Sequence, residues 1–254
     1  MALITLLTDF GYTDHYVAAV KAKLLHLAPS VQVMDISHGI EHHNLIHAAY
    51  VLQSVYRDFP KGTIHLVAVG AQETPIAFEA NGYWFVGSNN GLLSLIPEKT
   101  PEKIGRIVTA LDGPIRFMAK EILAPAAAQL AMGTPVEQIT EAFTDFKQFM
   151  GRSARATRKQ MAGNVIHIDH YGNLITNLME QDFTILSKGR KYQVLFSREQ
   201  LNKVNDTYQQ IEPGDCGVLF NSLGQLTILI KEGNAAQLLG LGIDSSVQIN
   251  FEDL

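Results

Sequence analysis

The sequence predicts an α/β domain with a mainly parallel sheet, followed by an all-β, barrel-like domain. In the first half, short apolar runs alternate with segments of helical periodicity, the pattern of β-α-β units. In the second half, short strand-like segments are separated by turn residues. Between them, residues 151–161 are basic and lack apolar periodicity, which predicts a linker between domains at 1–150 and 162–254. A basic arm for RNA is the other interpretation of this segment.

The first strand and helix form the most informative stretch of the first half. Residues 4–7 are apolar on both faces, as in a strand buried in a parallel sheet, and helical periodicity begins at Tyr16. Asp9 is therefore expected at the carboxyl end of a sheet strand, where open α/β sheets place their ligands. A second strand is expected at 31–35, followed by a helix that Asn44 caps.

The remaining elements continue these two patterns. In the first half we expect further strands at 63–69, 76–79, 83–86 and 104–109. A helix at 120–132 must place Pro125 in its first turn or bend there. In the second half, strands are expected at 165–168, 173–176, 191–196, 217–220, 226–231 and 246–251, with one helix near 234–239.

Composition and charge narrow the class of partner. The 254 residues are 46% hydrophobic and 18% charged, as in an ordinary globular protein. A net charge of −5 and a pI near 6.0 indicate no overall positive field that would attract nucleic acid. The sequence shows no signal peptide and no apolar run of membrane-spanning length, and Cys216 is its single cysteine. We expect a cytoplasmic protein that binds a small molecule, not nucleic acid or a membrane.

Two acidic residues lie in the turn after the first strand. Asp9 is placed either to accept hydrogen bonds from a ribose diol or to hold its own turn. Asp14 lies just before the first helix, where position alone predicts that its carboxylate caps the helix.

Four histidines gather at the start of the second predicted helix: His38, His42, His43 and His47. His43 and His47 would lie one turn apart on a helix and could share a metal ion. A third ligand with suitable spacing is not evident, so we predict polar residues at a helix start and no metal site.

Three turns in the second half carry groups suited to a heteroaromatic ligand. The turn Asp169-His170-Tyr171-Gly172-Asn173 combines a carboxylate, an aromatic ring and an amide, although a plain hairpin needs only the Gly and the Asn. The turns at 221–224 and 233–236 include Ser222, Asn234 and Ala235. Each of them is either a simple turn or a ligand contact.

Taken together, these motifs resemble the S-adenosylmethionine (SAM) hydroxide adenosyltransferase and halogenase family, which includes fluorinating and chlorinating enzymes. The resemblance covers nearly the whole chain. It rests on the order and spacing of Thr8-Asp9-Phe10-Gly11 with Asp14, Asp35-Ile36-Ser37-His38-Gly39-Ile40, Asn89-Asn90-Gly91-Leu92-Leu93, Ala124-Pro125-Ala126-Ala127-Ala128, the run from Asp169 to Asn177, Asn221-Ser222 and Gly233-Asn234-Ala235-Ala236. It implies a homotrimer whose ligand sites lie between one subunit's first domain and a neighbour's second. It also implies that SAM is a substrate or ligand, with no separate cofactor.

The resemblance implies roles for residues that match the family's motifs. Asp9 would hold the ribose hydroxyls, and Asp14 would support that turn. Asn173 and the Asn234-Ala235 segment would face adenine. Tyr171 replaces the family's usual Phe and would stack on the base.

The methionine end of the ligand would meet Asp169 and Ser222.

The family's catalytic Asp, Arg and His, by contrast, are not found at the matching positions. The loop at 70–75 has neither the Asp nor the Arg, and Met118 stands where the family has its His. The halogenase alternative is not clearly met either, because Gly70 and Ala119 stand at its positions.

Two hypotheses follow from this pattern. In the first, the protein binds SAM or adenosine and hydrolyses SAM to adenosine and methionine by attack of water or hydroxide at C5′. In the second, it is a catalytically inactive nucleoside-binding or trimeric scaffold protein. A metal-dependent hydrolase that uses the histidines is a third interpretation. The sequence identifies no catalytic base, because it places none of the available groups against a water: His65, Glu73, Lys120 and Glu121.

Overall fold

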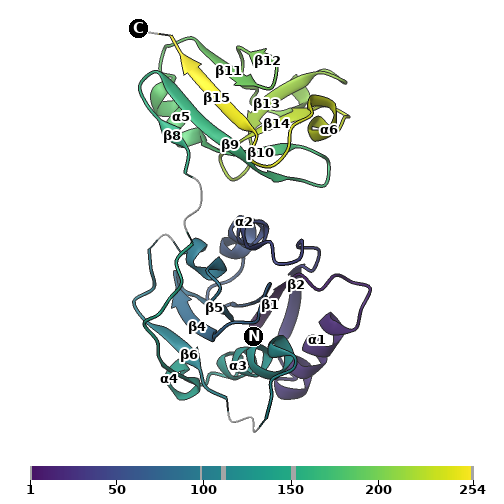
Figure 1. The fold of residues 1–254 in the computed structure, drawn as a ribbon, viewed down its shortest axis with the longest axis vertical. Coiled ribbons are helices and arrows are strands. Elements are labelled where there is room, and N and C mark those ends of the chain that lie inside the picture. Colours follow the sequence, from purple (N-terminus) through teal and green to yellow (C-terminus); the bar gives the residue numbers. More distant parts are fainter. Residues whose placement is uncertain (1, 98, 110–112, 150–152, 253–254) are drawn as a thin grey trace. The chain divides into compact units, whose positions relative to one another are not determined.

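A computed structural model describes residues 2–97, 99–109, 113–149 and 153–252 (Figure 1). The chain folds as two compact units, Met1–Gly151 and Arg152–Leu254, each with its own sheet and hydrophobic core. Within the predicted linker at 151–161, strand β8 (Arg155–Ala156) pairs with β9 (Gln160–Ile168). Residues 151 and 152 of that segment lie outside the described residues.

The first unit contains a seven-stranded mixed sheet in the order β2-β1-β3-β5-β4-β6-β7. Its strands are β1 (Leu3–Thr8), β2 (Gln32–Ser37), β3 (Ile64–Ala68), β4 (Pro75–Ala80), β5 (Tyr83–Ser88), β6 (Ile104–Ile107) and β7 (Thr140–Ala142). The prediction of a mainly parallel sheet is correct only for β2, β1, β3 and β5. The pairings β5–β4, β4–β6 and β6–β7 are antiparallel. Asn81 and Gly82, with φ of 54° and 79°, form the two-residue hairpin that reverses the chain between β4 and β5.

Helices cover both faces of this sheet (Figure 1). Alternate side chains of β1 point to opposite faces: Ile4 and Leu6 pack with helices α1 (Tyr16–Leu27) and α3 (Ala124–Ala131), whereas Leu7 packs with α2 (Leu45–Val55). A π-helical turn (Ala119–Leu123) leads into α3, and Pro125 lies in the first turn of α3. The shorter elements are η1 (Tyr56–Asp58), η2 (Leu92–Leu95) and α4 (Val136–Ile139).

The starts of α1 and α2 differ in how they are capped. Asn44 caps α2 as predicted, because its side-chain oxygen accepts the His47 N–H at 2.9 Å. The prediction that Asp14 caps α1 is wrong. The cap residue is His15, which makes no side-chain capping bond, and Asp14 lies one residue too early in the chain. None of the helices in the described ranges is both long and apolar enough to cross a bilayer.

The second unit is an antiparallel, barrel-like sheet in the order β12-β11-β15-β9-β10-β14-β13. Its other strands are β10 (Leu174–Met179), β11 (Tyr192–Phe196), β12 (Glu199–Leu201), β13 (Cys216–Phe220), β14 (Gln225–Ile230) and β15 (Ser246–Phe251). A bridge between Asn205 and Leu219 brings the chain after β12 beside β13, so the sheet nearly closes. The unit is not purely β, since it also contains α5 (Glu180–Leu186), which was not predicted, η4 (Tyr208–Gln210) and α6 (Ala235–Leu239).

Candidate functional site

Asp9 lies where the strand order of the first sheet reverses. From β1 the chain passes through α1 to β2 on one side, and then through α2 to β3 on the other side of β1. The carboxyl ends of β1 and β3 therefore form a topological switch point, the place where α/β sheets bind ligands. Asp9 is 8% exposed, and its Oδ2 accepts the backbone N–H groups of His43 and Gly70, each at 3.1 Å. Within the described ranges both bonds go to Oδ2, so Oδ1 remains available as an acceptor.

Three further loops converge on Asp9. They follow β2, β3 and β5 and carry His43, Gly70 and Asn90 respectively. Gly70 has a φ of +52°, and a Cβ placed on it would lie 3.2 Å from His43 Nδ1 and 3.6 Å from Asn90 Nδ2. Asn90 Nδ2 also donates to the Val69 carbonyl at 2.9 Å. At the switch point a carboxylate, an imidazole and an amide thus surround a glycine, at the place where α/β sheets of this kind form their binding crevice.

A chain of polar side chains holds the base of this crevice. His38 is fully buried; its Nδ1 lies 2.8 Å from Thr8 Oγ1 and its Nε2 lies 3.1 Å from Asp35 Oδ1. Lys21 Nζ lies 2.6 Å from the other Asp35 oxygen. Burial raises the pKa of Asp35, but the hydrogen bond from Lys21 and the proximity of His38 outweigh burial and hold that pKa below its usual 3.8. This network ties the end of β1, and therefore Asp9, to β2 and α1.

The histidine cluster does not form the arrangement considered from its spacing. His43 lies in the loop before α2 with a φ of 58°, so it does not stand one helical turn from His47. Burial lowers the pKa of His47, partly offset by the charge of Glu41. Across the described part of the chain, no group of three or more His, Cys, Asp and Glu side chains is placed to hold a metal ion.

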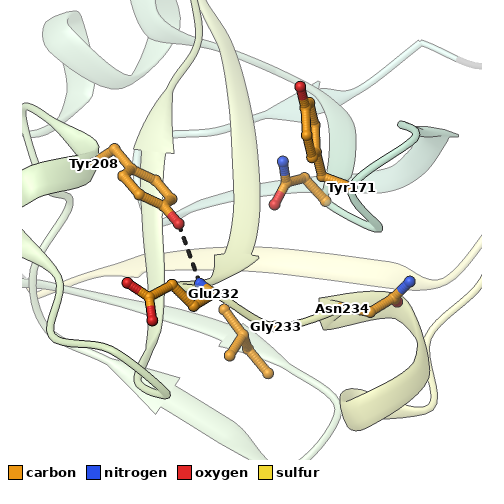
Figure 2. A pocket seen from close by; sticks show the side chains of 7 residues that line it. Tyr171, Tyr208, Glu232, Gly233 and Asn234 are labelled. Carbon is orange, nitrogen blue, oxygen red and sulfur yellow. Dashed lines mark hydrogen bonds between the residues drawn. The ribbon is translucent and has the colours of Figure 1, made fainter.

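The second unit contains a cavity of about 510 Å³. It is lined by residues from the β9–β10 turn, from η4 and from the segment that joins β14 to α6: Tyr171, Asn173, Tyr208, Ile230, Glu232, Gly233 and Asn234. Figure 2 shows Tyr171 and Tyr208 on opposite sides, with Glu232, Gly233 and Asn234 along the lower edge. The Glu232 N–H donates to Tyr208 Oη at 3.1 Å, and this bond holds the Tyr208 ring at one side of the cavity. The Tyr171 side chain, on the other side, is 76% exposed.

Internal hydrogen bonds shape the β9–β10 turn. Asp169 Oδ1 accepts the N–H groups of Tyr171 and Asn173 at 3.0 and 2.9 Å, and its Oδ2 accepts Asn173 Nδ2 at 2.9 Å. Gly172, with a φ of +84°, packs against Asn234 so closely that a Cβ would lie 2.2 Å from Asn234 Cγ. Asn234 in turn caps α6 by accepting the Gln237 N–H. The turn is therefore built by Asp169 and positioned against α6.

The structure brings together only part of the predicted binding set. Tyr171, Asn173 and Asn234 line the cavity. Ser222 is exposed on a hairpin turn and Ala235 is buried, and the cavity lining includes neither of them. In the first unit, Asp9 lies in the crevice, and Asp14 is exposed.

Several site residues were not predicted from the sequence, chiefly Tyr208 and Glu232 in the cavity, and Asn90 in the crevice. Asn90 belongs to the motif Asn89-Asn90-Gly91-Leu92-Leu93 of the family resemblance, to which no ligand contact is assigned from the sequence. The only available signal for Tyr208 is its residue type, because nothing in its neighbouring residues marks a site.

Comparison with known proteins connects both units to one family. Residues 4–140 match the model of the SAM hydroxide adenosyltransferase N-terminal domain, and residues 163–248 match that of the C-terminal domain. A protein of Thermus thermophilus named (R)-S-adenosyl-L-methionine hydrolase is 29% identical over 258 residues, covering 95% of this chain and 96% of its own. A protein of the same name from Methanocaldococcus jannaschii is 29% identical, covering 98% and 96%. A protein of Actinoplanes sp. named fluorinase is 26% identical, covering 71% and 72%.

Two solved structures are similar to this chain over nearly its whole length. The crystal structure of an uncharacterized conserved protein from Thermotoga maritima matches with a TM-score of 0.89 and 28% identity, covering 97% of this chain and 99% of that one. A conserved hypothetical protein from Thermus thermophilus matches with a TM-score of 0.77 and 26% identity, covering 99% and 100%.

Proposed function

Since this chain belongs to the SAM hydroxide adenosyltransferase family, we propose that it binds SAM and cleaves it to adenosine and methionine. Water or hydroxide attacks C5′ of the sulfonium, the C5′–S bond breaks, and the sulfur of methionine keeps the electron pair. SAM is then the substrate, and the reaction needs no cofactor. The single observation that carries this proposal is Asp9, a buried carboxylate at the switch point whose Oδ2 is occupied by two backbone N–H groups and whose Oδ1 is available.

The ribose is assigned to Asp9. An ionised carboxylate oxygen accepts hydrogen bonds from a diol, and bonds to a charged acceptor contribute about 1.5–3 kcal/mol. Because the Oδ2 bonds and the Thr8–His38–Asp35 network already fix the carboxylate, little ordering remains for the ligand to induce. Asp14, on the exposed loop after β1, is proposed to support this turn.

Adenine is assigned to the cavity of the second unit. Its two tyrosines offer ring faces for stacking, and Asn173 and Asn234 offer amides that match the donors and acceptors of a purine edge. The Asn234 side-chain oxygen already caps α6, so its amide nitrogen is the group that would reach the base. The backbone of the Asn234-Ala235 segment would complete the contact.

The methionine end is assigned to Asp169 and Ser222. Asp169 Oδ2 carries one hydrogen bond, from Asn173 Nδ2, and has capacity for an ammonium group. Ser222 exposes a hydroxyl on the turn between β13 and β14, suitable for a carboxylate. Both assignments rest on the family resemblance.

A homotrimer is proposed on the same resemblance, with each ligand held by the first unit of one subunit and the second unit of a neighbour. Light scattering coupled to size-exclusion chromatography tests it: a mass of three chains supports the trimer, and a monomer that still binds adenosine contradicts it. A cytoplasmic location, which the single Cys216 favours, is tested by cell fractionation.

A nucleoside-binding protein without turnover is the second candidate function. It is favoured by Met118, which packs against the core of the first unit and supplies no imidazole, and by Gly70, which supplies no side chain after β3. This observation concerns catalysis and leaves the binding assignments unchanged.

One experiment separates the two candidates. The purified protein is incubated with SAM, adenosine and methionine are followed by mass spectrometry, and adenosine binding is titrated by calorimetry. Equal amounts of adenosine and methionine, at a rate proportional to protein, support the hydrolase. Stoichiometric binding without products supports the binding protein, and no binding of either ligand overturns both.

A further inference from the structure

We propose that His43 is the general base of the hydrolysis, taking the proton from the water that attacks C5′. This inference rests on the proposed function. It concerns a residue that the sequence offered only as part of a histidine cluster. In the structure His43 lies in the loop before helix α2, where its backbone N–H is bonded to Asp9 and its side chain is exposed.

The backbone of His43 is held in a conformation that most residues avoid. Its φ of 58° lies in the left-handed region, which costs a non-glycine residue about 1–2 kcal/mol. The His43 N–H donates to Asp9 Oδ2 at 3.1 Å, the same oxygen that binds Gly70. Asp9, the residue proposed to hold the ribose, is therefore hydrogen-bonded directly to the backbone of His43. Backbone strain of this kind is found at sites where a side chain must be placed against its local preference.

The imidazole of His43 lies against the end of β3. Nδ1 is 3.2 Å from where a Cβ on Gly70 would stand, so the ring occupies space that any other residue at position 70 would fill. No described residue makes a hydrogen bond to the His43 ring, which leaves both ring nitrogens available to solvent or a ligand. We assign C5′ of a ribose held on Asp9 Oδ1 to the space beside this ring.

Three of the four groups considered from the sequence are engaged elsewhere. Glu73 forms an ion pair with Lys147, and Glu121 accepts the Arg116 N–H at 2.9 Å. His65 is fully buried, bonded to Thr5 and packed among aromatic rings. Burial lowers the pKa of His65 to about 4, so it stays neutral but has no access to a ligand in the crevice.

The chemical step balances with His43 as the only acceptor. The water oxygen forms a bond to C5′ while the C5′–S bond breaks and its electron pair stays on the methionine sulfur. The water proton moves to an unprotonated ring nitrogen of His43 and later leaves to solvent. A positioned base of this kind contributes about 10²–10⁴-fold in rate.

The decisive variant is His43→Asn, because asparagine tolerates the left-handed conformation and keeps the backbone N–H that Asp9 binds. His42→Asn is the matched control, since His42 is exposed, adjacent in the chain and outside the crevice contacts. We expect His43→Asn to lower kcat for SAM cleavage at least 100-fold while the adenosine Kd stays within threefold. His42→Asn should keep both values within threefold of the parent.

A second variant tests for proton transfer itself. His43→Gly removes the ring in a residue that adopts positive φ freely. Added imidazole is expected to raise the rate of SAM cleavage by His43→Gly at least tenfold and to leave the rate of the parent protein unchanged.

The outcomes distinguish this proposal from the proposed function. If the parent cleaves SAM and His43→Asn cleaves it at a similar rate, the role of His43 is overturned and the hydrolase stands. If kcat falls only in proportion to adenosine affinity, with no imidazole rescue, His43 is a packing residue and the proposal is also wrong. If the parent binds SAM without forming adenosine, both the proposed hydrolysis and the proposed role of His43 are wrong.

Discussion

The backbone N–H of Gly70 donates to Asp9 Oδ2 over 3.1 Å, which joins the loop after β3 to the carboxyl end of β1. The same oxygen accepts the His43 N–H, so one buried carboxylate oxygen organises three loops. In this arrangement the residue proposed to bind ribose also builds the crevice. Substitutions at Asp9 should therefore affect both stability and binding. The effect on stability can be measured by itself, because Trp84, the single tryptophan, lies in β5 of the first unit and its fluorescence follows the unfolding of that unit.

Asp9→Ala is expected to lower both the free energy of unfolding and the affinity for adenosine. Two backbone N–H groups lose their acceptor, which costs about 1–3 kcal/mol in the free energy of unfolding. Loss of the ribose acceptor should weaken adenosine binding at least tenfold. Urea unfolding followed by Trp84 fluorescence measures the first and calorimetry the second. Asp9→Asn, which retains one acceptor oxygen, should lose less stability. Unchanged adenosine affinity in Asp9→Ala would remove Asp9 from the ribose.

Gly70→Ala should be more harmful than the same change at another left-handed glycine. Gly62 has a φ of +83° and nothing within 4 Å of a built Cβ, so Gly62→Ala costs only the conformational term, about 1 kcal/mol. At Gly70 the new methyl group also meets His43 Nδ1 at 3.2 Å and displaces the ring. We expect both variants to be destabilised in urea, but only Gly70→Ala to lose SAM turnover. Equal turnover in the two variants would contradict the contact.

The buried His65 predicts a specific dependence of stability on pH. Burial lowers its pKa from 6.5 to about 4, so between these values the unfolded chain takes up a proton that the folded chain does not. The free energy of unfolding should therefore fall as pH decreases from about 6.5 to about 4, by about 3 kcal/mol from this group. Above pH 6.5 this contribution is fully present.

His65→Phe should remove that part of the pH dependence, as measured by urea unfolding with Trp84 fluorescence at pH 7.5 and pH 4.5. His26→Gln is the control, because His26 is exposed near the end of α1 and should leave the dependence unchanged. A pH dependence in His65→Phe as steep as that of the parent would show that other groups produce it.

Tyr171 provides a test of the cavity that leaves the fold intact. Because its side chain is 76% exposed, Tyr171→Ala should change the melting temperature by less than about 2 °C. Loss of a stacking ring should weaken adenosine binding about tenfold, and Tyr171→Phe, which keeps the ring, should bind within threefold of the parent. An unchanged affinity in Tyr171→Ala would place adenine elsewhere.

Local signals in the sequence were sufficient for most elements of the fold. The apolar run before Asp9 and the Asn44 cap depend on neighbouring residues, and both have their expected places. Of the two alternatives for Pro125, the structure has the first: α3 begins at Ala124, after a π-helical turn, so Pro125 lies in its first turn. The mixed sheet was missed although its signal was present, since Asn81-Gly82 between two apolar runs is the strongest short hairpin signal. Asp14 was assigned to a cap because sequence spacing does not resolve a helix start to one residue.

The site was harder to predict because its contacts are distant in sequence. Asp9 binds N–H groups 34 and 61 residues away, and no local pattern encodes either partner. Spacing placed His43 on a helix, whereas its positive φ turns it toward Gly70. Tyr208 reaches its cavity through a bond to Glu232, 24 residues later. Residues whose position depends on a tertiary contact could be proposed from the sequence only through the family resemblance.

The proposed hydrolysis requires that water attacks C5′ of SAM. The sulfonium carries three carbons, and attack at each gives different products: adenosine with methionine, methylthioadenosine with homoserine, or S-adenosylhomocysteine with methanol. The most direct measurement is to run the reaction in ¹⁸O-labelled water and analyse all products by mass spectrometry. Attack at C5′ places ¹⁸O in the 5′-hydroxyl of adenosine and gives unlabelled methionine in equal amount. Label in homoserine or methanol would contradict it, as would SAM that is bound but recovered uncleaved.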